Sequence, residues 1–156
     1  MGVYNHFNGK SGVIDAVWRR GFAELAKRMD SVDAIEDPRE ALYTAGQLYR
    51  TFALEHRTAY GLMFMGSVPG FTPSGESVLI SLTAFDGLTR AISRCMDHEV
   101  IAKGDETLVA QMIWSAVHGA MALELAQFSF AEDPAEVFHR LQLVLLEGLA
   151  PGTAAV

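Results

Sequence analysis

Apolar residues recur along most of the chain at intervals of three and four positions, the spacing that gathers side chains on one face of an α-helix. The first such segment runs from about Lys10 to Asp30. Further helices are predicted over about 38–56, 58–64, 77–98, 106–128 and 134–149. No segment of useful length alternates apolar and polar residues with the period of two that marks a strand. The pattern therefore predicts an all-α protein, built as a helical bundle.

Local signals place the boundaries of these helices. Asp37-Pro38 and Asp133-Pro134 each put an acidic N-cap before a proline at the first helical position. Residues 66–75 contain three glycines and two prolines, which predicts a loop. Pro151-Gly152 stops the last helix. These signals predict short connections and one longer loop in the middle of the chain.

The segment 107–123 is unusual because it carries no formal charge. A membrane-spanning helix needs about 20 predominantly apolar residues, so the segment is of borderline length. Gln111, Ser115 and His118 form a polar stripe along it, which disfavours a span. We expect instead a helix buried on nearly all sides, with one face in its own core and another against a second copy of the chain, and no membrane partner.

Charge is unevenly distributed along a chain whose net charge is −7. The first 30 residues hold five basic and three acidic side chains, and the remainder holds seven basic and sixteen acidic ones. Phosphates are bound by Lys and Arg, so the acidic remainder is excluded as a nucleic-acid surface and any such surface lies at the N-terminal end. A single cysteine, Cys95, and no continuous apolar run at the start of the chain lead us to expect a cytoplasmic protein.

Residues 2–13, GVYNHFNGKSGV, carry a recognisable motif. This string resembles the end of the helix-turn-helix in the tetracycline-repressor (TetR) family of bacterial regulators. There the recognition helix closes with an aliphatic-Tyr-x-His-Phe pattern, and a Lys begins a hydrophobic connecting helix. Val3, Tyr4, His6, Phe7 and Lys10 match that pattern position by position, and Ser11 replaces the acidic residue common after the Lys.

The likeness extends into the rest of the chain. Phe52-Ala53-Leu54-Glu55-His56, followed by Tyr60 and Met63-Phe64, is similar to a segment of one large subgroup of the family. Trp114, His118 and Gly119 resemble that subgroup's Trp-x-x-x-His-Gly element. The resemblance implies two parts, a remnant of the DNA-binding domain with its connecting helix over 1–30 and a ligand-binding and dimerisation domain over 31–156. The family's earlier helix-turn-helix elements are missing from this sequence, so we expect operator binding only with them.

The resemblance also implies partners and roles. The partners are operator DNA, a small-molecule effector and a second copy of the chain in a homodimer. Tyr4, His6 and Lys10 are expected to contact the DNA backbone, which positions a protein without reading sequence. The apolar and aromatic residues expected to line an effector pocket are Tyr60, Met63, Phe64, Phe71, Phe85, Trp114, His118 and Met121. The residues expected at the dimer interface are Val117, Met121, Val137, Leu141, Val144 and Leu145.

Other chemistry finds little support in the sequence. Glu136 and His139 form one Glu-x-x-His pair, whereas a di-iron bundle needs two such pairs and two further Glu. We therefore expect no metal, no cofactor and no enzymatic activity, and a di-iron-type helical enzyme is the weaker alternative. The same residues would serve a module that dimerises and binds a ligand but does not bind DNA, and this function stays an alternative to a DNA-binding regulator. His118 is interpreted either as a hydrogen-bonded core histidine or as a pocket residue.

Overall fold

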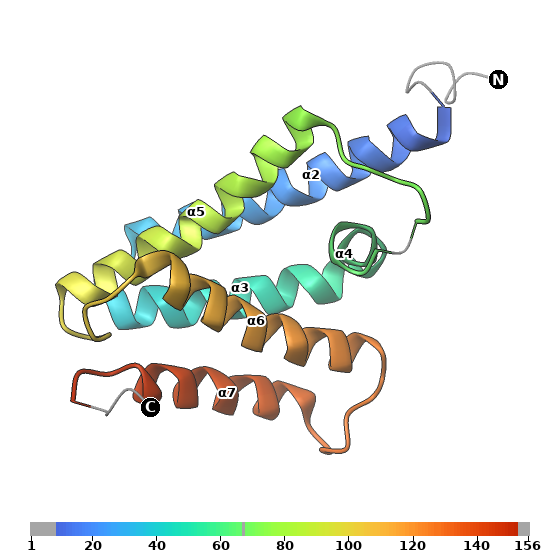
Figure 1. Ribbon diagram of the computed structural model, residues 1–156. Coiled ribbons are helices and arrows are strands. Elements are labelled where there is room, and N and C mark those ends of the chain that lie inside the picture. Colours follow the sequence, from blue (N-terminus) through green and yellow to red (C-terminus); the bar gives the residue numbers. More distant parts are fainter. Residues whose placement is uncertain (1–8, 67, 153–156) are drawn as a thin grey trace.

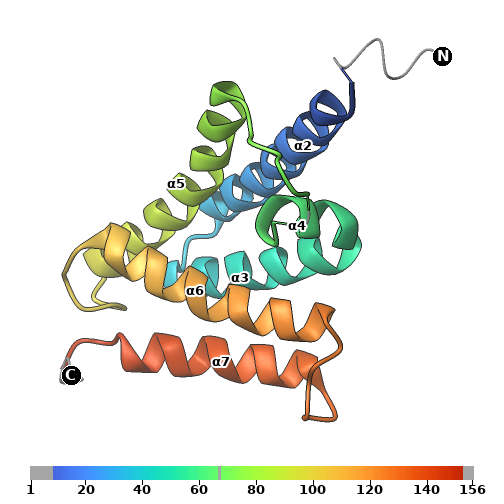
Figure 2. The ribbon, with the colours of Figure 1, turned by 45° about the vertical axis from the view of Figure 1, so that its right-hand side comes forward.

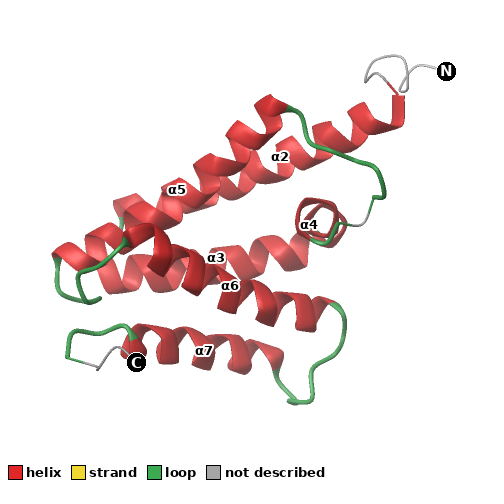
Figure 3. Ribbon diagram, in the orientation of Figure 1, coloured by secondary structure: helices red, strands yellow, loops and turns green. Residues whose placement is uncertain are grey.

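The computed structural model describes residues 9–66 and 68–152, and within them every regular element is helical (Figure 3). In chain order these are α2 (Gly9–Ser31), the short 3-10 helix η1 (Val32–Ala34), α3 (Pro38–Glu55), α4 (Arg57–Phe64), α5 (Gly75–Asp97), α6 (Glu106–Leu125) and α7 (Pro134–Gly148). The predicted all-α bundle is confirmed, and only η1 was not anticipated.

The helices begin at acidic or hydroxyl caps. Asp37 accepts a hydrogen bond from the Arg39 amide at 2.8 Å, and Asp133 accepts one from the Ala135 amide at 2.8 Å, as the two Asp-Pro signals predict. α5 starts two residues earlier than predicted because the Ser74 side chain accepts the Ser77 amide. α6 ends three residues earlier than predicted, at a turn where Gln127 adopts a φ of 55°.

Two groups of helices make up the body (Figure 1). α2 and α5 lie side by side and form the most extensive helix pair, while α6 and α7 form an antiparallel hairpin. α3 lies between these pairs and contacts α2, α5, α6 and α7. Figure 2 shows that α5 and α6 meet near the 98–105 connection and diverge toward α4.

Polar side chains hold the outer helices to the centre. The Arg94 guanidinium of α5 donates to backbone carbonyls of the α2–α3 connection, the shortest bond being 2.6 Å to Ile35 O. Gln142 of α7 donates to Tyr43 O of α3 at 2.9 Å, and its amide oxygen accepts from Gln47. Because Gln142 is buried, these bonds remove the cost of leaving its amide without partners.

The uncharged helix α6 is half enclosed within one chain, so its inner face lies in the core as expected, and the expected contact of its outer face with a second copy stays a prediction. Its inner face buries Ala110, Ile113, Val117 and Met121. Its outer face exposes Leu108, Met112 and Leu123 by 50% or more. By length and mean hydropathy, 1.3, α6 is the one helix of the described part that could cross a membrane, and its inner face packs against α3, α5 and α7.

The close approach of α2 and α5 gives the first prediction. A Cβ at Gly87 would lie 2.6 Å from the Cβ of Met29, so Gly87→Ala forces the two helices apart. We expect it to lower the free energy of unfolding by about 1–3 kcal/mol in urea titrations. Gly75→Ala in the same helix meets no atom within 4 Å and is expected to change stability by no more than about 0.5 kcal/mol. Equal stability of the two variants would contradict the close packing.

Candidate functional site

A cavity of about 450 Å³ lies between α2, α4, α5 and α6. Its walls are almost wholly apolar or aromatic. The lining residues are Phe22, Leu25, Met29, Tyr49, Met63, Phe64, Ser81, Leu82, Ala84, Phe85, Leu88, Gln111 and Trp114. A cavity of this volume and lining is of the kind that binds drug-sized molecules.

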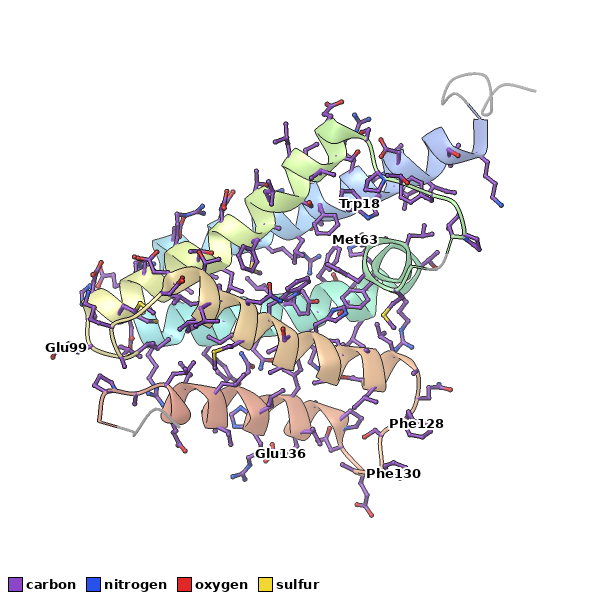
Figure 4. The ribbon with its side chains drawn as sticks, viewed as in Figure 1. Trp18, Met63, Glu99, Phe128, Phe130 and Glu136 are labelled. Atoms are coloured by element: carbon purple, nitrogen blue, oxygen red, sulfur yellow. The ribbon has the colours of Figure 1, made fainter. Side chains whose placement is uncertain are left out.

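α4 contributes Met63 and Phe64 to the cavity wall and packs against α2. The indole N–H of Trp18 on α2 donates to the backbone carbonyl of Met63 on α4 at 3.3 Å (Figure 4). Gly21 lets the Met63 side chain approach α2, since a Cβ there would lie 2.3 Å from the sulfur. α4 therefore packs tightly on α2, and its Met63 and Phe64 line the cavity together with residues of α5 and α6.

A second, smaller cavity of about 50 Å³ continues inward from the first. The two share Met29, Tyr49, Leu88 and Trp114, and the smaller one reaches α7 at Gln142, Leu145 and Leu146. Tyr49 and Trp114 thus stand at the inner end of the larger cavity. A wider groove of about 680 Å³ runs along the other side of α2, but charged side chains such as Arg20, Glu24 and Lys27 line it.

A cluster of hydrogen-bonded side chains stands behind the inner wall. Trp114 donates its indole N–H to the Tyr49 hydroxyl at 3.2 Å. The Tyr49 and Tyr60 hydroxyl oxygens lie 2.9 Å apart, and both are within 3.0 Å of His118 Nδ1. We call these four residues the Tyr49 cluster. It joins α3, α4 and α6.

Burial shifts the pKa values of the Tyr49 cluster in the direction that favours the uncharged side chains. It raises the pKa of Tyr49 to about 12, and it also raises the pKa of Tyr60. Burial lowers the pKa of His118 from its ordinary value of 6.5. Among the described residues, no buried side-chain nitrogen or oxygen is left without a partner, and no three His, Cys, Asp or Glu gather as metal ligands. The lining of the cavity contains no charged side chain, which suits the binding of a neutral molecule.

The structure brings together part of the predicted pocket. Met63, Phe64, Phe85 and Trp114 line the cavity, whereas Tyr60 and His118 lie behind it in the Tyr49 cluster. Met121 is fully buried in the core. Phe71 is partly buried against the core from the α4–α5 connection and does not line the cavity.

Residues that the sequence analysis did not assign complete the lining. They include Phe22, Leu25 and Met29 of α2, which form the wall opposite Trp114. They are spaced three and four positions apart, the same helical period that the core residues follow. Periodicity cannot separate a side chain that faces a cavity from one that faces the core, so no signal in the sequence distinguishes them.

The predicted dimer residues fall into two groups. Val137 and Val144 of α7 are exposed by 44% and 63%, and Leu141 and Leu145 are partly buried. Val117 and Met121 are exposed by only 5% and 0% within a single chain. A second copy cannot reach Val117 or Met121, so the structure removes both from the expected interface.

The expected DNA-contacting residues lie at the start of the chain. Tyr4 and His6 fall outside the described residues. Lys10 is exposed in the first turn of α2. One turn further, the Asp15 carboxylate accepts hydrogen bonds from the Ser74 amide, the Ser74 hydroxyl and the Ser77 hydroxyl, all within 3.0 Å. These bonds lower the pKa of Asp15 despite the opposing effect of its burial and tie the start of α5 to α2.

Comparison with known proteins supports the same fold. Residues 42–145 match the family described as "Tetracyclin repressor-like, C-terminal domain". A protein with unknown function from a Rhodococcus species superposes with a TM-score of 0.82, at 23% identity over 93% of this chain and 75% of that one. The TetR family transcriptional regulator PfmR from Thermus thermophilus gives 0.77, at 17% identity over 94% and 80%. A search of curated protein sequences returned no match.

The lowered pKa of His118 predicts a pH dependence of stability. As pH falls below about 6.5, the unfolded chain binds a proton at this ring before the folded chain does, so the folded state loses stability until its own pKa is passed. In His118→Gln this contribution is absent. The stability of the wild type relative to the variant should therefore be greatest above about pH 6.5 and decline on acidification.

Chemical denaturation across this pH range gives the free energy of unfolding of the wild type and of His118→Gln. The other histidines contribute equally to both proteins, so the difference between the two values reports on His118 alone. A difference that stays constant, or that grows on acidification, would contradict the buried, neutral assignment of His118.

Proposed function

Because the chain belongs to the tetracycline repressor-like family, we propose that it is a ligand-responsive transcriptional regulator, acting as a cytoplasmic repressor whose helical body binds a small apolar or aromatic effector. The observation that carries this proposal is the uncharged cavity between α2, α4, α5 and α6. One of its walls is α2, the helix that leads directly from the segment resembling the end of a helix-turn-helix.

The contacts of α2 suggest how occupancy of the cavity is communicated. Phe22, Leu25 and Met29 line the cavity in the second half of this helix. Asp15 and Arg19 in its first half bind the start of α5, through the Ser74 and Ser77 hydroxyls and through an ion pair with Glu76 at 3.0 Å. A molecule lodged between α2 and α5 would shift one relative to the other, and with it the N-terminal end of α2.

The first 30 residues are proposed to be the end of the DNA-binding domain and its connecting helix, and residues 31–156 the effector-binding and dimerisation domain. Lys10 is exposed at the N-terminus of α2, where the helix dipole adds to its positive charge. With Tyr4 and His6 it would contact phosphates, while the rest of a complete helix-turn-helix reads the operator bases.

Dimerisation is proposed to use the outer faces of α6 and α7. These neighbouring helices expose Met112, Leu123 and Val144 by 50% or more. In a chain of net charge −7, the uncharged face of α6 offers a second copy an approach without like-charge repulsion. This face does not involve the first 30 residues, so the same contacts would serve a module that dimerises without binding DNA.

Effector binding is tested by thermal shift with a library of neutral apolar and aromatic compounds. A compound at a hundred times its Kd should stabilise the folded state by about 2.7 kcal/mol. Ala84→Met places a larger side chain in the cavity wall and should abolish the shift. Thr83→Met, at the neighbouring exposed position of α5, should retain it. A shift that survives Ala84→Met would place the ligand elsewhere.

The dimer is tested by sedimentation equilibrium at micromolar concentration. Val144→Glu introduces a charge into the proposed contact and should yield monomers, because a buried and unpaired carboxylate is strongly disfavoured. Val78→Glu changes a comparably exposed valine on α5, 42% against 63%, and should leave the dimer intact. A wild-type protein that sediments as a monomer, or a Val144→Glu variant that remains dimeric, would refute this interface.

A further inference from the structure

The polar atoms of the cavity wall are unevenly distributed between its two ends. None of the thirteen lining residues is charged. The lining residues with polar side-chain atoms are Tyr49, Ser81, Gln111 and Trp114. Tyr49 and Trp114 stand at the inner end, where the smaller cavity begins, and Ser81 and Gln111 belong to the partly or fully exposed surfaces of α5 and α6.

The polar atoms of the inner pair already lie against polar atoms of the protein. A tyrosine hydroxyl can donate one hydrogen bond and accept two. Tyr49 already has three neighbours for them, namely Trp114 Nε1, Tyr60 Oη and His118 Nδ1. The only N–H of the Trp114 indole is donated to Tyr49. Because protein partners occupy the space around the Tyr49 hydroxyl and the Trp114 N–H, the two residues offer a ligand mainly the apolar surfaces of their rings.

The outer pair keeps such capacity. The Ser81 hydroxyl donates to Val78 O at 2.7 Å, which leaves its oxygen able to accept. The Gln111 amide nitrogen donates one hydrogen bond to Ser115 Oγ at 3.2 Å. Its second N–H and its amide oxygen have no partner among the described residues and, because the residue is exposed, they are open to solvent or to a ligand.

We propose that the effector is a neutral amphiphile bound in one orientation, with its apolar end inward against Tyr49 and Trp114 and its polar group outward at Gln111 and Ser81. The proposal rests on the effector-binding function above and specifies its ligand class. A second polar group at the inner end would lose its water without gaining a partner, and a charged group would find no counter-ion in the lining. The Tyr49 cluster therefore disfavours ligands with a polar inner end, because the Trp114 N–H and the Tyr49 hydroxyl are bonded to protein groups instead of to the ligand.

The test compares 1-octanol with 1,8-octanediol, which differ only in a hydroxyl at the far end. Dissociation constants come from calorimetry and from tryptophan fluorescence. The wild type should bind the diol about tenfold to a hundredfold more weakly. Octanoate and octylammonium should bind more weakly than 1-octanol, because no lining residue supplies a counter-ion. Equal binding of either ion and the alcohol would overturn the neutral-ligand assignment.

Any apolar site binds a diol more weakly than an alcohol, so the comparison alone does not show which end of the cavity discriminates between them. Two variants, one at each end, make that distinction. Tyr49→Phe frees the Trp114 N–H, so the inner end gains a donor and the ratio of the two dissociation constants should narrow by about fivefold or more. Gln111→Leu removes the outer anchor and should weaken both alcohols by a similar factor, about fivefold to tenfold, with the ratio unchanged.

The control for Tyr49→Phe is Tyr43→Phe, on the same helix but outside the larger cavity, and it should preserve the wild-type ratio. The control for Gln111→Leu is Thr107→Val, at an exposed position of the same helix outside the lining, and it should preserve both dissociation constants. If urea denaturation shows that Tyr49→Phe is unfolded, Trp114→Phe takes its place. This substitution removes the indole N–H that donates to Tyr49, so the Tyr49 hydroxyl gains a free acceptor site.

An unchanged ratio in the Tyr49 or Trp114 variant, or unchanged binding in Gln111→Leu, would overturn the orientation. If neither alcohol binds while other compounds shift the melting temperature, the amphiphile proposal fails and the effector function stands. If no compound of any class binds the folded protein, both fail.

Discussion

The hydroxyl of Tyr49 is the point on which the interior of this protein depends. It joins α3, α4 and α6 through hydrogen bonds with Tyr60, His118 and Trp114. Each of these groups would be costly to bury alone, and together they satisfy one another. Because the four side chains hold three helices at set distances, the space next to them persists as a cavity instead of collapsing under apolar packing.

α2 and α5 form the opposite wall, and their contacts differ along their length. Near Gly87 and Met29 they are too close to admit even a methyl group. Near Asp15 they are joined by hydrogen bonds to Ser74 and Ser77 at a helix start. The cavity residues Phe22 and Leu25 lie between these two attachments. This wall is thus anchored on both sides of the place where a ligand would lie, so that occupancy strains the anchors.

α6 serves two surfaces at once. Trp114 and His118 belong to the cavity wall and its supporting cluster, while Leu108 and Met112 face outward. A helix without charges between Glu106 and Glu124 can serve both, because neither face requires a charged side chain. The Glu124 carboxylate at its end is directed to Arg50 of α3, at 2.6 Å, instead of to the outer face. We propose that the outer face of α6 contacts a second copy of the chain, while its inner face borders the cavity for the effector.

The sequence by itself determined the local structure and the family. Apolar spacing located the helices, Asp37 and Asp133 marked two of their starts, and the match of residues 42–145 to the family confirms the predicted TetR-like fold. These features depend on residues a few positions apart, so a single sequence contains them. The element around Trp114 and His118 lies on α6, which forms one wall of the cavity.

Only the tertiary structure decided which inward-facing residues border the cavity. Phe22 and Leu25 line it, while Met121 and Val117, with the same helical spacing and apolar character, are buried in the core. His118 could be interpreted in two ways until its ring was found within 3.0 Å of two tyrosines, 58 and 69 positions away in sequence. Periodicity gives the direction in which a side chain points, but what it meets there depends on helices brought together by the whole fold.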